Sequence, residues 1–206
     1  MDLPGHGASP GPALDDVARL GQLAGELIDF LAPGGAVVVG HSLGGAIALW
    51  LALERPACVR GLVLVGTGGR LRVRADLLAG FERAAPGAGE RFVELSFGPA
   101  ADRRTLARGR RRLGAPPAVT AADLRAADRF DVLERLGAVR APTVAVGGAD
   151  DRLTPPKYSR TLALDIPGAD GVIVPGAGHM VMMEAPEAVT AAVRAVVYRS
   201  NSRSLG

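Results

Sequence analysis

The sequence predicts an α/β protein with a parallel sheet and helices on both faces. Four short apolar runs rich in valine have the composition of buried strands, and segments with helical patterning separate them. These runs are residues 36–40, 61–65, 143–146 and 171–174. Strands that alternate with helical crossovers form parallel sheets, and such sheets bind ligands beyond the carboxyl ends of their strands. The residues that follow each run are therefore the first candidates for a functional site.

Helical patterns fill the spaces between these runs. They cover residues 15–31, 45–54, a segment that begins near 155–156, and residues 186–198. Asp15 is the expected cap of the first helix, and the turn formers Pro33-Gly34-Gly35 end it. We expect residues 199–206 to form a disordered tail.

Residues 70–131 interrupt the alternation of strands and helices. This stretch contains no convincing strand, only short helical pieces that are broken by glycine and proline and are rich in arginine. We therefore expect one core domain, formed by residues 1–69 and 132–198, with residues 70–131 as a helical insertion.

Composition excludes several classes of protein. The 206 residues suffice for one domain with a real core, and 48% hydrophobic residues with only 4% aromatic ones indicate a core of Ala, Val and Leu. No apolar run is long enough to span a membrane. Cys58 is the only cysteine, so it cannot form an internal disulfide, and we expect a small buried residue there.

The basic charge does not predict nucleic-acid binding. The net charge is only +3, and Lys157 is the sole lysine, so the basicity comes almost entirely from arginine. No P-loop, zinc-ligand spacing or RNA-binding aromatic motif accompanies it. We expect no nucleic-acid partner, no metal ion and no cofactor. We expect a cytoplasmic location, although the absence of a signal peptide ahead of Met1 carries little weight in a chain expected to be shortened.

The stretch Gly40-His41-Ser42-Leu43-Gly44 lies directly between the first strand and the following helix. It matches G-x-S-x-G, the nucleophile elbow, in which the serine takes a strained conformation at a sharp turn. The flanking glycines permit that turn, and we expect Gly44 and Gly45 to let the strand and the helix pack closely. Ser42 is therefore a candidate nucleophile, the alternative being an ordinary turn serine.

A serine hydroxyl needs a base to become a nucleophile at neutral pH. Imidazole is suited to this because its pKa lies near neutrality, and a carboxylate on its other nitrogen fixes the tautomer. Asp151 and His179 each follow a predicted strand, as Ser42 does. The three residues should therefore meet at one edge of the sheet, as a catalytic triad in the chain order Ser, Asp, His.

These motifs together resemble the α/β-hydrolase fold family. The resemblance is carried by residues 2–7 (Asp-Leu-Pro-Gly-His-Gly), the elbow, residues 148–155 and residues 176–179 with 184–187. It implies that Ser42 is the nucleophile, His179 the general base and acid, and Asp151 the acid of the triad. It also implies an oxyanion-hole donor at the Leu43 N–H and a lid at residues 70–131.

The activity that the resemblance implies is hydrolysis of a small-molecule ester-like bond through an acyl-enzyme on Ser42. Carboxylesterase, lactonase and thioesterase chemistry all remain open, because the lid sets the substrate. Two side-chain clusters are also open to two interpretations. Met180, Met182 and Met183 either line an acyl pocket or pack beneath the last helix. The arginines at 103, 104, 108, 110, 111 and 112 either attract an anionic or carrier-bound substrate or form a solvated face.

Each site residue has a neighbour that competes for its role. Asp150 is adjacent to Asp151, but the family pattern places the acid four residues before a proline, which favours Asp151. His41 abuts Ser42, yet neighbouring side chains diverge at such a turn, so we expect a structural role. His6 lies in the opening loop and is expected to brace the site.

The sequence departs from the family at its beginning. In the family, the Asp-Leu-Pro-Gly-His-Gly stretch follows a strand near the middle of the sheet, and several strands precede it. We therefore expect an N-terminally shortened member, in which the strand at residues 36–40 has an open edge and the second oxyanion donor is not in this chain. The alternative function is a catalytically weak or inactive remnant, or a binding module.

Overall fold

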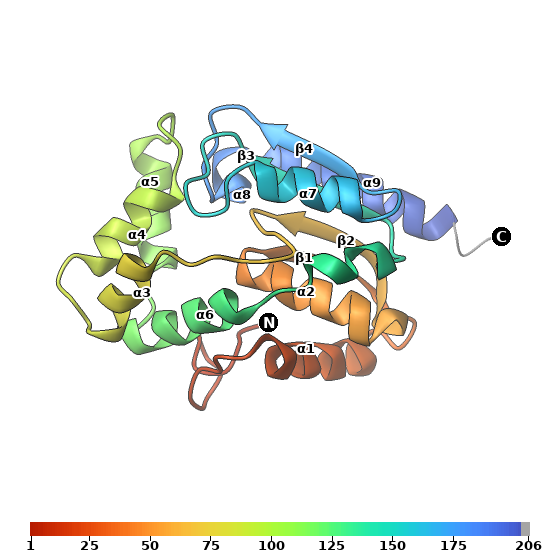
Figure 1. Ribbon diagram of the computed structural model, residues 1–206, viewed down its shortest axis with the longest axis horizontal. Helices are drawn as coiled ribbons and strands as arrows, with labels where there is room; N and C mark the ends of the chain where they lie inside the picture. The colour runs from red at the N-terminus through yellow and green to blue at the C-terminus, as the bar shows by residue number, and fades with distance from the viewer. Residues whose placement is uncertain (203–206) are drawn as a thin grey trace.

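A computed structural model describes residues 1–202 of the protein, and the predicted parallel sheet is confirmed there. The sheet of these residues has four strands in the order β1-β2-β3-β4 (Figure 1). They are β1 (Ala36–His41), β2 (Val59–Val65), β3 (Thr143–Gly148) and β4 (Asp170–Val174). Each contains one of the predicted apolar runs, and each neighbouring pair is parallel.

Helices connect these strands and cover the sheet. The described helices are α1 (Val17–Leu31), α2 (Leu43–Glu54), α3 (Ala75–Glu82), α4 (Ala88–Ser96), α5 (Arg103–Arg112), α6 (Pro117–Arg129), α7 (Lys157–Asp165), α8 (Val181–Glu184) and α9 (Pro186–Ser202). Short 3₁₀ turns occupy Pro56–Cys58 and Leu133–Ala138. None of the helices within residues 1–202 has the length and apolar character needed to cross a membrane.

Both faces of the sheet are buried, which explains why the strands read as continuous apolar runs. Side chains alternate between the faces along a strand. In β2, Leu62 and Leu64 pack in the cluster that contains α1, α2 and α7. The intervening Val63 and Val65 pack on the opposite face with residues of α9, among them Val196.

Strand β1 lies at one edge of the sheet. Within residues 1–202 it pairs with β2 alone. Val39, near its end, is 50% exposed although it is apolar. The expectation of an edge at this strand is therefore met in the described part of the chain, and a further strand beside it stays a prediction.

Helices α3 to α6 form one group between β2 and β3 (Figure 1). Their segment begins and ends side by side, because Arg70 and Asp131 form an isolated antiparallel bridge. The side chains of the same two residues also form an ion pair. The group lies beside the carboxyl ends of the strands in Figure 1. Its role as a lid stays a prediction.

Two predicted helix ends were wrong. The cap of α1 is Asp16, whose carboxylate accepts the Arg19 N–H at 2.9 Å, because Asp15 is engaged by arginines of α6 instead. Helix α9 continues to Ser202, so residues 199–202 do not belong to a disordered tail. The side chain of Arg199 forms an ion pair with Asp170 of β4 at 3.1 Å, and Ser200 is buried, with 5% of its surface exposed. The last turn of α9 is therefore packed against the rest of the domain. The rest of the predicted tail, residues 203–206, lies outside the described residues.

Candidate active site

Ser42 occupies a sharp turn between β1 and α2. Its backbone has φ 52° and ψ −117°, a conformation that non-glycine residues rarely adopt. The turn is held by hydrogen bonds from the Ser42 N–H to the Val65 carbonyl (3.0 Å) and from the Thr67 hydroxyl to the Ser42 carbonyl (2.8 Å). The strained serine that the motif predicts is therefore present.

The glycines around Ser42 do not all serve the same purpose. A Cβ at Gly40 would lie 2.2 Å from the Gly44 carbonyl oxygen, and one at Gly45 would lie 2.4 Å from Thr67 Cγ2. A Cβ at Gly44 would meet nothing within 4 Å. The expectation that Gly44 is needed for close packing was therefore wrong, and Gly40 and Gly45 carry that requirement.

Asp151 and His179 form a buried pair. His179 Nδ1 lies 2.9 Å from Asp151 Oδ2, and the two residues are only 3% and 4% exposed, respectively. Burial alone would raise the pKa of Asp151, but its hydrogen bond to His179, the charge of His179 and bonds from Thr154 together lower it. An ionised Asp151 can only accept, so Nδ1 of His179 carries the hydrogen and Nε2 is left with a lone pair.

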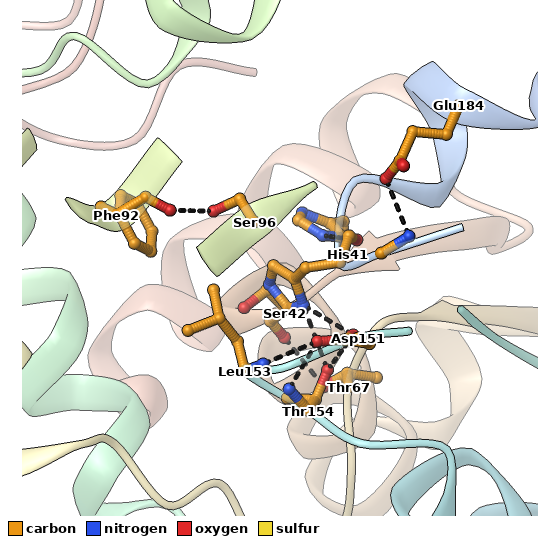
Figure 2. A network of polar contacts seen from close by, with 11 residues as sticks. His41, Ser42, Thr67, Phe92, Ser96, Asp151, Leu153, Thr154 and Glu184 are labelled. Carbon is orange, nitrogen blue, oxygen red and sulfur yellow. Dashed lines mark hydrogen bonds and ion pairs between the residues drawn. The ribbon is translucent and has the colours of Figure 1, made fainter. Parts of the chain in front are cut away.

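A third residue, Thr154, holds the carboxylate of this pair in place. The Thr154 hydroxyl donates to Asp151 Oδ2 at 2.7 Å, and the Leu153 and Thr154 N–H groups both donate to Oδ1 at 2.8 Å (Figure 2). The Asp151 carboxylate is thus held by the loop that carries it. Sequence reasoning missed Thr154, whose only signal is its position three residues after Asp151.

The competing residues lie elsewhere. The Asp150 side chain is exposed, and only its neighbour Asp151 contacts His179. His41 Nε2 lies 3.0 Å from the His179 carbonyl, and the two rings are 4.6 Å apart. Removal from water, together with the nearby His179, lowers the pKa of His41 to about 3. His41 is therefore neutral, donates its ring N–H to that carbonyl, and supports the loop of His179.

His6 connects the opening loop to the helical segment. Its Nε2 lies 2.9 Å from Asp123 Oδ2 of α6. Burial opposes a charge on His6, but the hydrogen bond and the negative charge of Asp123 outweigh it and raise the pKa of His6. His6 therefore braces α6 and contacts neither Ser42 nor His179 in the recorded hydrogen bonds of residues 1–202.

Ser42 and His179 line one cavity of about 60 Å³. Most of its wall is apolar and comes from the segment between β2 and β3, with Leu71, Val73, Leu77, Phe92, Leu124 and Ala127. Within residues 1–202, the structure records no hydrogen bond from the Ser42 hydroxyl to the His179 ring. Such bonds are commonly long in the absence of substrate and tighten when it binds.

A larger cavity of about 740 Å³ borders the loop that carries Asp151. Residues of α4 and α5 line it together with Asp150, Asp151 and Arg152, and its wall includes neither Ser42 nor His179. The three methionines line neither cavity. Met180 is buried against Val93 and Phe97 at the end of α4, with Met182 and Met183 beside it. Of the three, Met182 also packs with residues of α9, so the methionines pack mostly against α4 and only in part beneath the last helix.

Two further predicted features concern backbone and surface. Leu43 is the first residue of α2, so its N–H has no acceptor within the helix and is free to bind an oxyanion. Its role in an oxyanion hole stays a prediction. The six arginines of α5 are all exposed, and an electrostatic role for them also stays a prediction. Cys58 is buried as expected, with its Sγ 3.1 Å from Asp29.

Comparison with known proteins places this chain. Residues 1–193 match the model of the Alpha/beta hydrolase family. Pimeloyl-[acyl-carrier protein] methyl ester esterase from Nitrosomonas europaea is 32% identical over 204 residues, 91% of this chain and 79% of the relative. The putative carbamate hydrolase RutD from Klebsiella pneumoniae is 34% identical over 193 residues, 85% of this chain and 70% of the relative.

Solved structures agree with this assignment. A thermophilic esterase superposes with a TM-score of 0.87 at 36% identity, covering 97% of this chain and 79% of that one. A hydrolase from Pseudomonas aeruginosa superposes with a TM-score of 0.84 at 31% identity, covering 95% and 77%. The chain thus belongs to the alpha/beta hydrolase family and is a hydrolase of that family.

Proposed function

We propose that this hydrolase cleaves carboxylic ester bonds through an acyl-enzyme on Ser42. The observation that carries the proposal is the pair of Asp151 and His179 beside the cavity that Ser42 shares. Asp151 holds Nδ1 of His179, so Nε2 is the nitrogen left to accept a proton. A strained serine, a fixed imidazole and a buried carboxylate are the parts that acyl transfer requires.

In the proposed reaction, Ser42 Oγ attacks the carbonyl carbon of the ester while His179 Nε2 accepts the hydroxyl proton. The Leu43 N–H stabilises the oxyanion that forms, since it points from the start of α2. His179 then returns the proton to the leaving alcohol. A water molecule, deprotonated by His179, then attacks the carbonyl carbon of the acyl-enzyme. The bond from that carbon to Ser42 Oγ breaks, the acid leaves, and His179 returns the proton to Ser42 Oγ.

The names of similar proteins favour an ester over other acyl substrates. The pimeloyl-[acyl-carrier protein] methyl ester esterase and the thermophilic esterase are both named for ester hydrolysis. The similarity to the carbamate hydrolase RutD shows that related proteins are also named for other carbonyl substrates. Fold alone does not set the substrate, so the cavity has to supply that argument.

The cavity at Ser42 favours a short acyl group. Its volume of about 60 Å³ holds only a few water-sized groups, and its wall is largely apolar. Helices α3, α4 and α6 contribute that wall through Leu77, Phe92 and Leu124, in keeping with a lid at residues 70–131. We therefore expect acetyl and butyryl esters to be better substrates than long-chain ones.

A fluorophosphonate probe tests the proposal, because it reacts with activated serines. We expect one label per chain in the native protein, at Ser42, and none in Ser42→Ala. Ser9→Ala, at a half-buried serine of the opening loop whose hydroxyl donates to the Asp2 carbonyl, is the matched control and should label normally. A folded sample that neither labels nor hydrolyses p-nitrophenyl acetate or butyrate contradicts the proposal and favours an inactive remnant or a binding module.

A further inference from the structure

Glu184, the last residue of α8, joins two segments that are far apart in the sequence. Its Oε2 accepts the Gly98 N–H at 2.8 Å, and its Oε1 accepts the Gly178 N–H at 3.0 Å. Gly98 lies between α4 and α5, and Gly178 directly precedes His179. Figure 2 shows the carboxylate of Glu184 and its hydrogen bond to the Gly178 N–H.

The two segments that Glu184 joins touch through their backbones. A Cβ at Gly98 would lie 2.3 Å from the Gly176 carbonyl oxygen, and one at Gly178 would lie 2.3 Å from the Gly98 nitrogen. The Met180 N–H also donates to the Ser96 carbonyl at 3.0 Å. The connection after α4 is therefore pressed against the His179 loop, with Glu184 bridging the contact.

The same end of α4 is attached to the other half of the acid–base pair. The guanidinium of Arg152, next to Asp151, donates to the carbonyls of Glu94 and Phe97 at the end of α4. The Asp151 loop and the His179 loop thus both hold the end of this helix. Phe92, one turn earlier in α4, lines the cavity at Ser42.

We propose that Glu184 is a positioning residue, whose carboxylate fixes the His179 loop to the end of α4 and so keeps His179 in register with Ser42. The proposal rests on the function proposed above. Glu184 does not touch the reacting atoms, and it acts through Gly178 on one side and Gly98 on the other.

The surroundings of Glu184 disfavour its negative charge in the folded protein. Burial raises the pKa of Glu184, the N–H groups of Gly98 and Gly178 counteract this in part, and the charges of Asp151 and Asp150 raise it further. A raised carboxyl pKa means that the folded protein disfavours the ionised form. Removing the charge by itself should therefore cost little stability, so the cost of a Glu184→Gln substitution comes mainly from the hydrogen bond that the amide cannot accept.

The test compares Glu184→Gln with Glu187→Gln, an exposed glutamate in the first turn of α9. The glutamine oxygen can still accept one of the two N–H groups, from Gly98 or Gly178. Its NH₂ group cannot accept the other, because both are donors. We expect kcat for p-nitrophenyl acetate to fall about 10-fold with KM within about 2-fold, measured well below the melting temperature of the variant. That melting temperature should fall by only a few degrees, because one N–H loses its acceptor. Glu187→Gln should leave all three quantities unchanged.

Amide hydrogen exchange supplies a measurement that does not depend on activity. In the unmodified protein, the Gly98 and Gly178 amides should both be protected from exchange, and both should exchange faster in Glu184→Gln. Unprotected exchange of either amide in the unmodified protein would overturn the proposal even if the variant does not fold. So would a normal kcat in a folded variant, or a loss of kcat that simply follows a loss of melting temperature.

The failure of this inference is distinguishable from failure of the proposed function. If the unmodified protein is not labelled at Ser42 by a fluorophosphonate, the proposed function is wrong, and with it the role in catalysis. If the unmodified protein labels and hydrolyses esters while Glu184→Gln does so at the same kcat, only the positioning role is wrong.

Discussion

The Asp151 carboxylate lies 2.9 Å from His179 Nδ1, and the two side chains are 0% and 4% exposed. Water therefore does not compete for this contact, and Thr154 occupies a further lone pair of Asp151. Because Asp151 is held by its own loop, it acts as a fixed acceptor that sets the orientation of the imidazole. The direction of Nε2, and hence the proton transfer that we propose from Ser42, depends on this pair.

Asp151→Asn should abolish most of the activity without unfolding the protein. The amide can present its NH₂ group to Nδ1, which would move the hydrogen of His179 to Nε2 and remove the base. We expect kcat for p-nitrophenyl acetate to fall by about 10³–10⁴. Asp150→Asn is the matched control because Asp150 is exposed, and it should stay within about 2-fold of the native kcat. A larger loss in Asp150→Asn than in Asp151→Asn would contradict this assignment.

The main architecture could be predicted from the sequence because its signals are local. The strands are apolar runs, and the elbow needs glycines and a serine at a fixed spacing between a strand and a helix. The rule that parallel strands bring their carboxyl ends to one edge brings Asp151 and His179 together with Ser42, and the family pattern favours Asp151 over the adjacent Asp150. None of these inferences requires knowledge of which distant residues are in contact.

The features that sequence reasoning missed depend on distant contacts. Glu184 and Gly98 are 86 positions apart, and nothing in either stretch identifies the other as its partner. Asp15 and Asp16 are equivalent as helix caps until the arginines of α6 engage Asp15. Gly44 looked like its neighbours Gly40 and Gly45, and only the position of Thr67 distinguishes Gly45.

The elbow glycines should differ in their tolerance of a methyl group. Gly45→Ala places a Cβ 2.4 Å from Thr67 Cγ2, so we expect a loss of about 1–3 kcal/mol in the free energy of unfolding. Gly44→Ala meets no neighbour within 4 Å and lies inside α2, so it should gain up to about 1 kcal/mol. Urea denaturation of both variants measures the difference. Equal stabilities would show that the α2–Thr67 contact is looser than described.

His41 should make the protein sensitive to acid. The pKa of His41 is about 3 in the folded protein, against an ordinary value of 6.5. Between these two pH values the imidazole of His41 therefore binds a proton in the unfolded chain but not in the folded one. Stability is therefore lost as pH falls from 6.5 towards 3. His41→Gln lacks this group, and its free energy of unfolding should fall by about 2–3 kcal/mol less than that of the native protein between pH 7 and pH 4. Parallel pH profiles for the two proteins would contradict the role assigned to His41.

His6 should act in the opposite direction and in a different pH range. Its pKa is raised by Asp123, so the charged pair stabilises the folded state fully below the unfolded pKa, and this contribution is lost as pH rises through the folded pKa. Comparison of His6→Gln with the native protein by urea denaturation should therefore show a larger difference at pH 5.5 than at pH 8.5. Both side chains are about a quarter exposed, so we expect about 1 kcal/mol at most.

Asp123→Asn provides the control for the His6 experiment, because it removes the charge that raises the pKa of His6 while leaving an acceptor oxygen in place. If the pair is the cause, the pH-dependent part of the difference should disappear in Asp123→Asn, and His6→Gln should add nothing to it in the double variant. Since His41 acts only below pH 6.5, the loss on the alkaline side belongs to His6 alone among these two histidines. A pH dependence that survives in Asp123→Asn would show that another group supports His6.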